Sequence, residues 1–254
     1  MLLRRVIDHV ESQNWFAVCI DFVIVVAGVL FALTAEQWLR DAQQREDLDQ
    51  AEAIVNYDLL TNLFAARELL ALAPCRRERT ATLSLLLKED DNNWNGLPWQ
   101  AHSGAFGSQL PEVLPTPYRL WGSRIWDAES SIGTFTAMDT ERRRALDSIF
   151  TGANVILRKQ EDIFDAQSRL KILAMERKMN SSERVKYLEI LHYHDQQSGM
   201  LELLAQQTVV QLESFGFSSD ESYLEEFSEY FPTYTEARIE RYGSCFIPFE
   251  MPFL

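Results

Sequence analysis

An apolar segment near the N-terminus constrains this chain more than any other feature. Residues 14–38 read NWFAVCIDFVIVVAGVLFALTAEQW, and the one charged side chain between Trp15 and Ala35 is Asp21. Trp15 and Trp38 are separated by about 34 Å along a helix with a rise of 1.5 Å per residue. That spacing places one indole at each interface of a hydrocarbon layer about 30 Å thick. The pattern predicts a transmembrane helix over 14–38, with Trp15 and Trp38 as interface anchors.

The region before this segment favours a retained anchor over a cleaved signal peptide. It is long, it contains Asp8 and Glu11, and no clear small-x-small cleavage site follows it. Its apolar residues recur at helical spacing, which predicts a short helix lying in the cytoplasmic membrane interface over residues 1–13. These apolar residues are Leu3, Val6, Ile7 and Val10.

One face of the predicted span combines small residues with the carboxylate. Within about 60° of one another at 100° per residue lie Ala17, Asp21, Gly28, Ala32 and Ala35. Gly28 and Ala32 form a small-xxx-small pair, which lets two helix backbones approach closely. An unpaired charge at the bilayer centre costs about 2.5–3.5 kcal/mol on insertion scales. Either this face packs on another membrane helix that pairs Asp21, or local thinning lets Asp21 reach the headgroups. Intramembrane acids usually face protein, which favours the first interpretation.

Helical periodicity continues beyond the membrane segment. Residues 40–47 contain no glycine or proline, so the helix can extend as a stalk. Apolar residues then recur at threes and fours from Leu48 to Leu70, which predicts an amphipathic helix that ends near Pro74. A second short helix is expected over about 76–89.

A long irregular connection follows over residues 91–123. It holds four of the eight prolines and carries Trp94, Trp99 and Trp121. Loops longer than about 15 residues are commonly functional or disordered, and the aromatic content argues against disorder. The three tryptophans therefore either cap the helices or form an aromatic-rich interaction surface.

The remaining chain is again helical in pattern. Apolar spacing resumes after a plausible Asp139 cap, and MNSSER interrupts it before a helix that Ser182 can cap. A short acidic helix is expected within 215–231, and the apolar C-terminus, CFIPFEMPFL, should dock as extended chain. The predicted fold class is all-α: a single N-terminal transmembrane helix continuing into an antiparallel helical bundle over 39–254.

Charge and cysteines bear on partners and location. The net charge is −14, from 24 Lys+Arg against 38 Asp+Glu, which opposes nucleic-acid binding but permits a basic protein partner. Arg4 and Arg5 precede the span while Arg40 and Arg45 follow it, so the positive-inside count is nearly balanced.

Of the three cysteines, Cys19 lies in the span, which leaves Cys75 and Cys245 in the body. They are either a disulfide pair or two separate thiols. The even number in the body favours a cytoplasmic N-terminus and a periplasmic body.

Catalytic and metal-binding motifs are weak throughout. Ser168 and Lys171 match S-x-x-K inside a helix pattern, without the companion motifs of a serine acyltransferase. Glu189 and His192 have the spacing of a di-iron ligand pair, but no second E-x-x-H exists. The GAFG at 104–107 lacks the strand, helix and lysine of a phosphate loop. The span contains no histidine, which excludes imidazole ligation of haem or chlorophyll by this helix. No catalytic, metal or cofactor residue is predicted, and the chain is not expected to be an enzyme.

The segment NWFAVCIDFVIVVAGV closely resembles the start of an uncharacterised group of bacterial single-pass inner-membrane proteins, and WDAESSIG at 126–133 resembles a second shared patch. The resemblance implies a cytoplasmic N-terminus and a helical periplasmic body, and it carries no assigned activity. The expected role is an accessory or scaffold subunit of a respiratory, photosynthetic or transport complex in the inner membrane. The alternatives are a self-associating homo-oligomer, a periplasmic sensor and, last, an enzyme.

Overall fold

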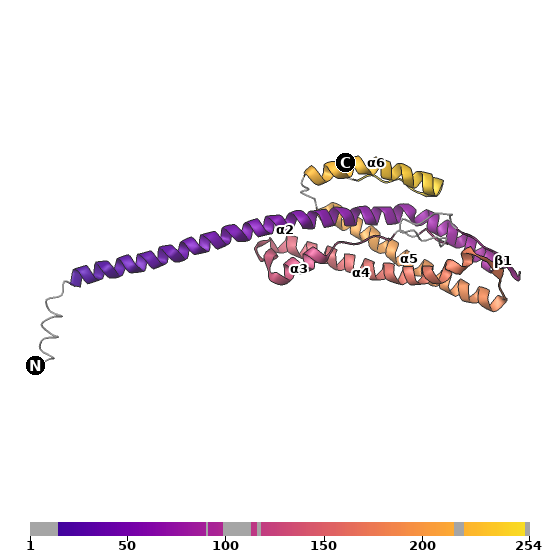
Figure 1. Ribbon diagram of the computed structural model, residues 1–254, viewed down its shortest axis with the longest axis horizontal. Helices are drawn as coiled ribbons and strands as arrows, with labels where there is room; N and C mark the ends of the chain where they lie inside the picture. The colour runs from indigo at the N-terminus through magenta and orange to yellow at the C-terminus, as the bar shows by residue number, and fades with distance from the viewer. Residues whose placement is uncertain (1–14, 90, 99–112, 116–117, 216–220, 252–254) are drawn as a thin grey trace, which may run out of the picture. The chain divides into compact units, whose positions relative to one another are not determined.

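The computed structural model describes residues 15–89, 91–98, 113–115, 118–215 and 221–251, with side chains from Cys19 onward except those of 221–227. It divides into two compact units, Met1–Gln50 and Ala51–Leu254. Figure 1 labels the main elements, and the all-α prediction is confirmed for the described residues. In chain order they are α2 (Trp15–Leu87), β1 (Asn93–Asn95), α3 (Arg124–Ile132), η1 (Thr134–Ala137), α4 (Thr140–Leu170), η2 (Lys171–Ala174), β2 (Glu176–Lys178), α5 (Ser181–Phe215), α6 (Glu221–Tyr242) and η3 (Gly243–Cys245).

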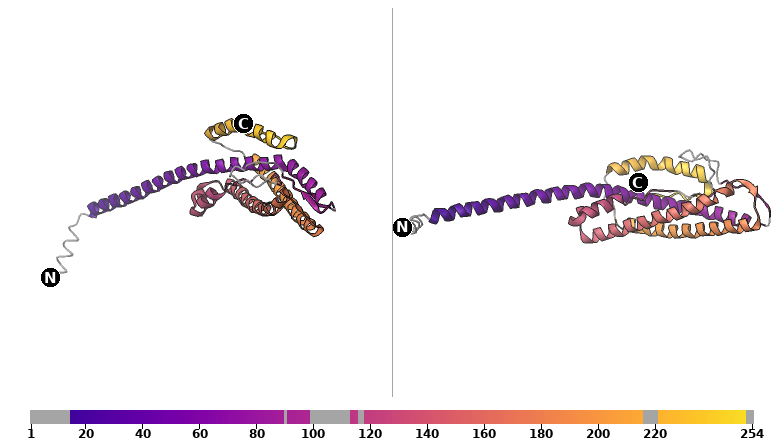
Figure 2. Two further views of the ribbon diagram at one scale, coloured as in Figure 1. Left: turned by 45° about the vertical axis from the view of Figure 1, so that its right-hand side comes forward. Right: turned by 60° about the horizontal axis from the view of Figure 1, so that its bottom comes forward.

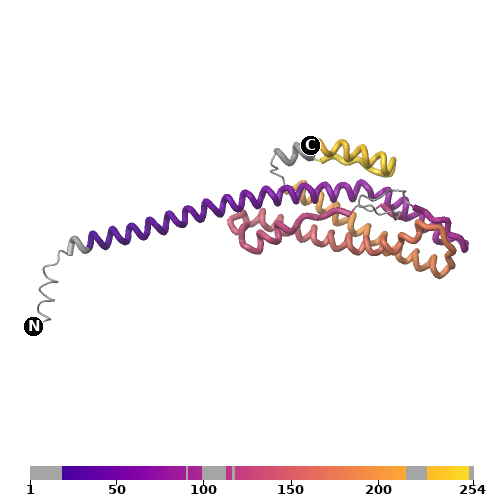
Figure 3. Tube along the Cα trace, in the orientation of Figure 1, coloured from indigo at the N-terminus to yellow at the C-terminus, as the bar shows by residue number. Residues whose placement is uncertain are grey.

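The body of the second unit is built on three long helical segments. The C-terminal half of α2, α4 and α5 lie side by side in both views of Figure 2. One hydrophobic cluster joins all three, because α2 contributes Ala66 and Leu69, α4 contributes Ile163, and α5 contributes Leu201 and Ala205. Figure 3 follows the reversal of direction between α4 and α5, as expected of antiparallel neighbours.

Pro74 does not end the helix, contrary to the sequence prediction. The single helix α2 continues through it to Leu87, so the separate helix expected over 76–89 is the last part of α2. A proline removes one N–H and crowds the preceding turn, which frees nearby carbonyl groups. The Ala71 carbonyl accepts a hydrogen bond from the Ile247 amide at 3.1 Å. Burial of Leu72 and Leu83 on either side of the proline keeps the helix in place.

A small antiparallel ribbon was not anticipated from the sequence. Trp94 of β1 pairs with Arg177 of β2, flanked by Asn93 with Lys178 and Asn95 with Glu176. Three-residue strands are too short to show a readable alternation of polar and apolar residues. The ribbon fastens the start of the 91–123 connection to the break between α4 and α5.

The helix caps follow the sequence prediction at one helix and depart from it at another. Asp139 caps α4 by accepting hydrogen bonds from the amides of Glu141 and Arg142, and these bonds lower the pKa of its carboxyl. The predicted Ser182 cap is wrong. Asn180 caps α5, with its Oδ1 accepting from the Glu183 amide while Glu183 Oε2 accepts from the Asn180 amide. This reciprocal pair is a capping box, which satisfies two amides where a serine satisfies one.

The C-terminal region docks on α2. The acidic helix is longer than predicted, since α6 passes through Pro232. The extended segment after it places Phe246 and Met251 in the interior, as expected from its apolar composition. Phe246 packs with Leu72 and Cys75 in a small separate cluster.

Candidate functional site

The segment predicted to span a membrane is helical from Trp15 onward and forms the start of α2. Within the described residues, one helix is long and apolar enough to cross a membrane, and its apolar part lies near the N-terminus with none of it buried by the protein. The large apolar side chains on it are open to the surroundings; Phe22 is 68% exposed and Phe31 is 78% exposed. Large exposed apolar surfaces are typical of contacts with lipid or with another protein.

No described residue covers the small-residue face at the start of α2. Asp21, Gly28 and Ala32 are exposed, and Ala35 is partly exposed. A Cβ added at Gly28 would meet nothing within 4 Å, so a partner backbone has room to approach there. The Ala17 and Trp15 side chains lie outside the description, and Trp38 is 69% exposed.

The tryptophans of the 91–123 connection, expected either to cap the helices or to form an interaction surface, are in the interior where they are described. Trp94 and Trp121 are 3% and 5% exposed, so neither can contact a partner, and Trp99 lies outside the described residues. Trp94 donates its indole N–H to the Leu173 carbonyl at 2.7 Å, and the Arg184 guanidinium stacks over its ring. Burial of both side chains fits the capping interpretation, and the indole N–H of Trp94 is bonded in its buried position.

The described residues of the weak catalytic motifs do not come together into a site. The Ser168 hydroxyl donates to the Asp165 carbonyl one turn earlier, a local helix bond. Glu189 and His192 are exposed on α5, and residues 104–107 lie outside the description. Among described residues, no group of three His, Cys, Asp or Glu side chains is placed to hold a metal ion.

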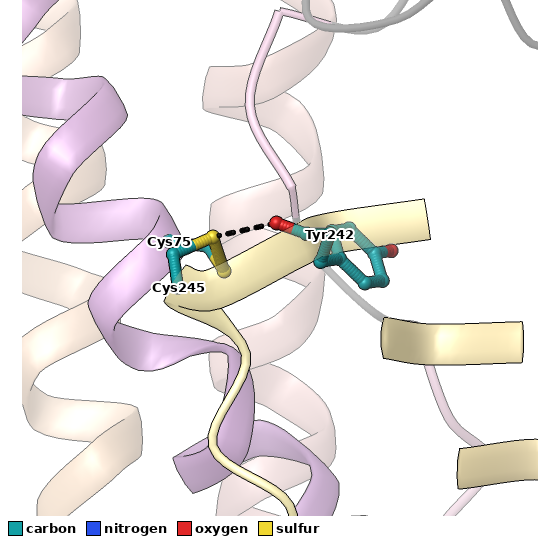
Figure 4. Close-up of a disulfide and its surroundings, with 3 residues drawn as sticks. All are labelled: Cys75, Tyr242 and Cys245. Carbon is teal, nitrogen blue, oxygen red and sulfur yellow. Dashed lines mark hydrogen bonds between the residues drawn. A yellow bond between two sulfur atoms is a disulfide. The ribbon is translucent and has the colours of Figure 1, made fainter. Parts of the chain in front are cut away.

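Cys75 and Cys245 form a disulfide in the structure (Figure 4). Their Cα atoms are 4.8 Å apart and the bond joins α2 to the chain after α6. Cys75 is fully buried, and the Cys245 sulfur also lies 3.1 Å from the Tyr242 carbonyl oxygen. The bond lies one residue after Pro74, so the C-terminal segment is held where the proline interrupts the helix.

A buried carboxylate joins three parts of the body. Glu68 of α2 has no exposed surface, and Arg119 binds it through two nitrogens at 2.5 and 3.0 Å. Arg238 of α6 lies 2.7 Å from Glu68 Oε1, which also accepts a hydrogen bond from the Tyr234 hydroxyl. Bonding to Glu68 raises the pKa of Arg119, and burial followed by the Glu68 charge raises the pKa of Tyr234. We call these four residues the Glu68 cluster.

Aromatic rings pack around the Glu68 cluster. Phe64 lies edge-on to Tyr234 with a centroid separation of 4.9 Å, and Phe249 from the C-terminal segment packs on Phe64 at 5.9 Å. The Arg238 guanidinium stacks on the Tyr234 ring at 4.9 Å. Low surrounding polarity strengthens each charged hydrogen bond and makes any unpaired member costly. The cluster therefore fixes α6 and residue 119 of the connection onto α2.

A second ion network joins α2 to α5. Arg76 is 5% exposed, lies 2.8 Å from Asp195 and also pairs with Glu202. The other carboxylate oxygen of Glu202 lies 2.8 Å from Arg77. His194 lies fully buried next to this network, and burial followed by the Arg76 charge lowers its pKa to about 4. Its Nδ1 is 3.5 Å from the Ser198 hydroxyl, and its Nε2 has no hydrogen-bond partner among the described residues.

The residues of both networks were missed by the sequence analysis, although a signal exists. Glu68 lies four residues after Phe64 and four before Leu72, both buried, and Arg76 follows Leu72 by four. A charged residue within an apolar helical stripe indicates a buried pair. The spacing could have identified Glu68 and Arg76 as buried, but not their partners.

The lowered pKa of His194 predicts that the body loses stability as the pH falls. The unfolded imidazole titrates near 6.5 and the folded one near 4, so the unfolded chain binds more protons between these values. The stabilisation is complete above pH 6.5 and is lost as the pH falls towards 4. The expected loss is about 3 kcal/mol, at 1.36 kcal/mol per pKa unit.

Urea unfolding of the full chain at pH 7.5, 5.5 and 4.5, followed by circular dichroism, measures this effect. The variant His194→Leu should flatten the slope relative to the natural chain, whereas the exposed His192→Gln should leave it unchanged. Equal slopes for the natural chain and His194→Leu would show that another group controls the dependence.

No family model matches the sequence, and no curated protein or solved structure is significantly similar to it. The interpretation of function therefore depends on the residues and contacts described above. Of these, the small-residue face at the start of α2 is left uncovered by the described residues, whereas the carboxylates of both ion networks are paired with arginines of the body.

Proposed function

We propose that the chain is a non-catalytic accessory or scaffold subunit, anchored in the bacterial inner membrane and attached there to a larger respiratory, photosynthetic or transport complex. One observation carries the proposal: Asp21 lies on an uncovered small-residue face of an apolar helix. A carboxylate at that depth is stabilised when a neighbouring helix supplies a hydrogen-bond donor or a cation. Gly28 and Ala32 provide the close approach that such a contact needs.

The proposed topology has the N-terminus in the cytoplasm and residues 39–254 in the periplasm. The Cys75–Cys245 disulfide supports it, because disulfides persist in the oxidising periplasm and are rare in the cytosol. The N-terminal resemblance implies the same orientation.

The construction of the body supports a scaffold role. The Glu68 cluster, the Arg76 network and the disulfide join distant segments of the described chain. A body fixed in this way presents a constant surface to a partner at low entropic cost. Its acidic character, with a net chain charge of −14, favours a basic partner protein.

Gentle solubilisation of the tagged full-length protein from its native membrane, followed by mass spectrometry of what co-purifies, tests the proposal. Other inner-membrane subunits in constant ratio to the chain would establish an accessory subunit and identify its complex. A chain that purifies without other subunits would overturn the proposal and leave the homo-oligomer or the sensor.

Replacing Asp21 by leucine is expected to weaken this assembly. Interhelical hydrogen bonds in membranes contribute about 0.6–2 kcal/mol, so the yield of co-purified subunits at limiting concentration should fall about 3- to 30-fold. Insertion should improve, because the substitution removes a charge from the bilayer. Quantitative mass spectrometry of the tagged variant measures the change.

Two further variants separate the contact from a general disturbance of the helix. Gly28→Leu should weaken assembly by blocking close approach, while Leu30→Ala, on the opposite side of the helix, should not. If Asp21→Leu co-purifies with the same subunits in the same amounts, Asp21 reaches the headgroups and has no partner.

A further inference from the structure

Helix α5 carries a second apolar stripe on the side away from the core. Its buried side consists of residues such as Leu191, Leu201 and Leu212. On the opposite side, Met200 and Leu203 are 50% and 48% exposed, although both are apolar. The full stripe repeats at threes and fours within about 100° of the helix circumference. It consists of Tyr193, Gln196, Met200, Leu203, Gln207 and Val210. We call this set the α5 stripe.

The α5 stripe has the heptad spacing of a coiled-coil seam. Tyr193, Met200 and Gln207 are seven apart, and so are Gln196, Leu203 and Val210, the two sets being offset by three. Positions a and d of a heptad are related in this way. The stripe extends about 26 Å along the helix axis at 1.5 Å per residue. Gly199 borders it, and a Cβ there would meet nothing within 4 Å, so the edge of the stripe is open.

No charged side chain lies on the α5 stripe, although 24% of the chain is charged. Between His192 and Phe215, α5 has three charged residues, and all three pair with arginines of α2. Asp195 and Glu202 bind Arg76, and Glu213 binds Arg67. The acidic groups of this part of α5 are therefore directed to α2, which leaves the opposite side neutral over five turns.

We propose that a second copy of this chain packs on the α5 stripe. Two copies each carrying a net charge of −14 repel one another wherever their acidic surfaces meet. A neutral stripe is where two such bodies can approach without bringing like charges together. The stripe is also self-complementary, as a two-fold interface requires. This pairing is independent of the partner proposed for the span.

Two arrangements of the pair follow from the heptad positions. A parallel pair places each residue against its own counterpart, so Leu203 meets Leu203 and Gln196 meets Gln196. An antiparallel pair places Leu203 against Met200, Tyr193 against Val210 and Gln196 against Gln207. The glutamine amides can donate and accept across the seam in both arrangements, and apolar residues meet at the other positions.

The test measures the native mass of the full-length protein in mild detergent, with the variant Leu203→Glu. Particles of the natural protein are expected to contain two copies of the chain. Leu203→Glu should raise the dissociation constant of the pair at least about 100-fold, because it brings buried charge into the seam. Leu85→Glu is the matched control, because Leu85 is an exposed apolar residue of α2 outside the stripe, at 67% exposure. A native mass that never includes a second copy of the chain would overturn the proposal. So would a Leu203→Glu pair that is as tight as the natural one.

Opposite charges then locate the contact. Co-expressed Leu203→Glu and Leu203→Lys chains with different tags should recover a mixed pair if α5 helices are parallel. Leu203→Glu with Met200→Lys should recover it if they are antiparallel. Recovery in either mixture supports the stripe, and recovery in neither overturns it. The readout is the second copy of this chain, so it is distinct from the co-purified subunits that test the proposed function.

Discussion

Replacing Glu68 by leucine is expected to lower the free energy of unfolding by about 3–5 kcal/mol, because Arg119 and Arg238 would keep their charges while losing their shared acceptor. Glu68 has no exposed surface, and the two arginines are only 33% and 18% exposed. The Tyr234 hydroxyl would lose the same acceptor. Unpaired charges in a poorly hydrated position are among the costliest changes a fold can undergo.

Chemical denaturation of the full chain, followed by circular dichroism, measures the loss. Asp165→Asn is a suitable control, since Asp165 pairs with Arg169 at 3.7 Å on an exposed helix surface and should change stability by under about 1 kcal/mol. Tyr234→Phe should fall between the two, at about 1–3 kcal/mol, because it removes one hydrogen bond to a charged group. A Glu68→Leu variant as stable as the natural chain would mean that water enters and solvates the arginines.

Removing the disulfide with Cys75→Ser and Cys245→Ser together is expected to destabilise the body by about 4–5 kcal/mol. The bond closes a loop with a sequence separation of 170 residues, and the chain-entropy account gives its largest stabilisation to long loops. The expected local effect is release of the C-terminal segment, including the hydrogen bond from the Ile247 amide to the Ala71 carbonyl. Phe246 and Met251 would then become exposed.

Thermal unfolding with and without a thiol reductant measures the global effect, and hydrogen exchange at Ile247 measures the local one. Cys19→Ser is the control, because Cys19 is a free thiol in the apolar part of α2. Reductant should lower the midpoint of the natural chain and of Cys19→Ser, but not that of the double variant. Equal midpoints for all three chains without reductant would show that the disulfide adds nothing to stability.

Much of the fold was predictable because its causes lie close together in the sequence. The Asp139 cap depends on amides two and three residues away, and the apolar stripes of α4 and α5 repeat within a few turns. The docking of the C-terminal segment followed from its apolar composition. The wrong predictions relied on local signals, and contacts with distant residues overrode those signals in the folded structure. Pro74 would end an isolated helix, but packing on both sides of it and the segment at Ile247 keep α2 continuous.

The sequence by itself determined the apolar N-terminal segment with Asp21 on its small-residue face, the helical character of the body and the presence of two body cysteines. Those properties arise from composition and from periodicities of three to four residues. Only the tertiary structure decided that Cys75 meets Cys245, that Glu68 meets Arg119, Tyr234 and Arg238, and that Trp94 and Trp121 are buried. Such pairings join residues tens to more than a hundred positions apart. Their partners are selected by the packing of whole helices, and no local pattern encodes which distant residue will be the partner.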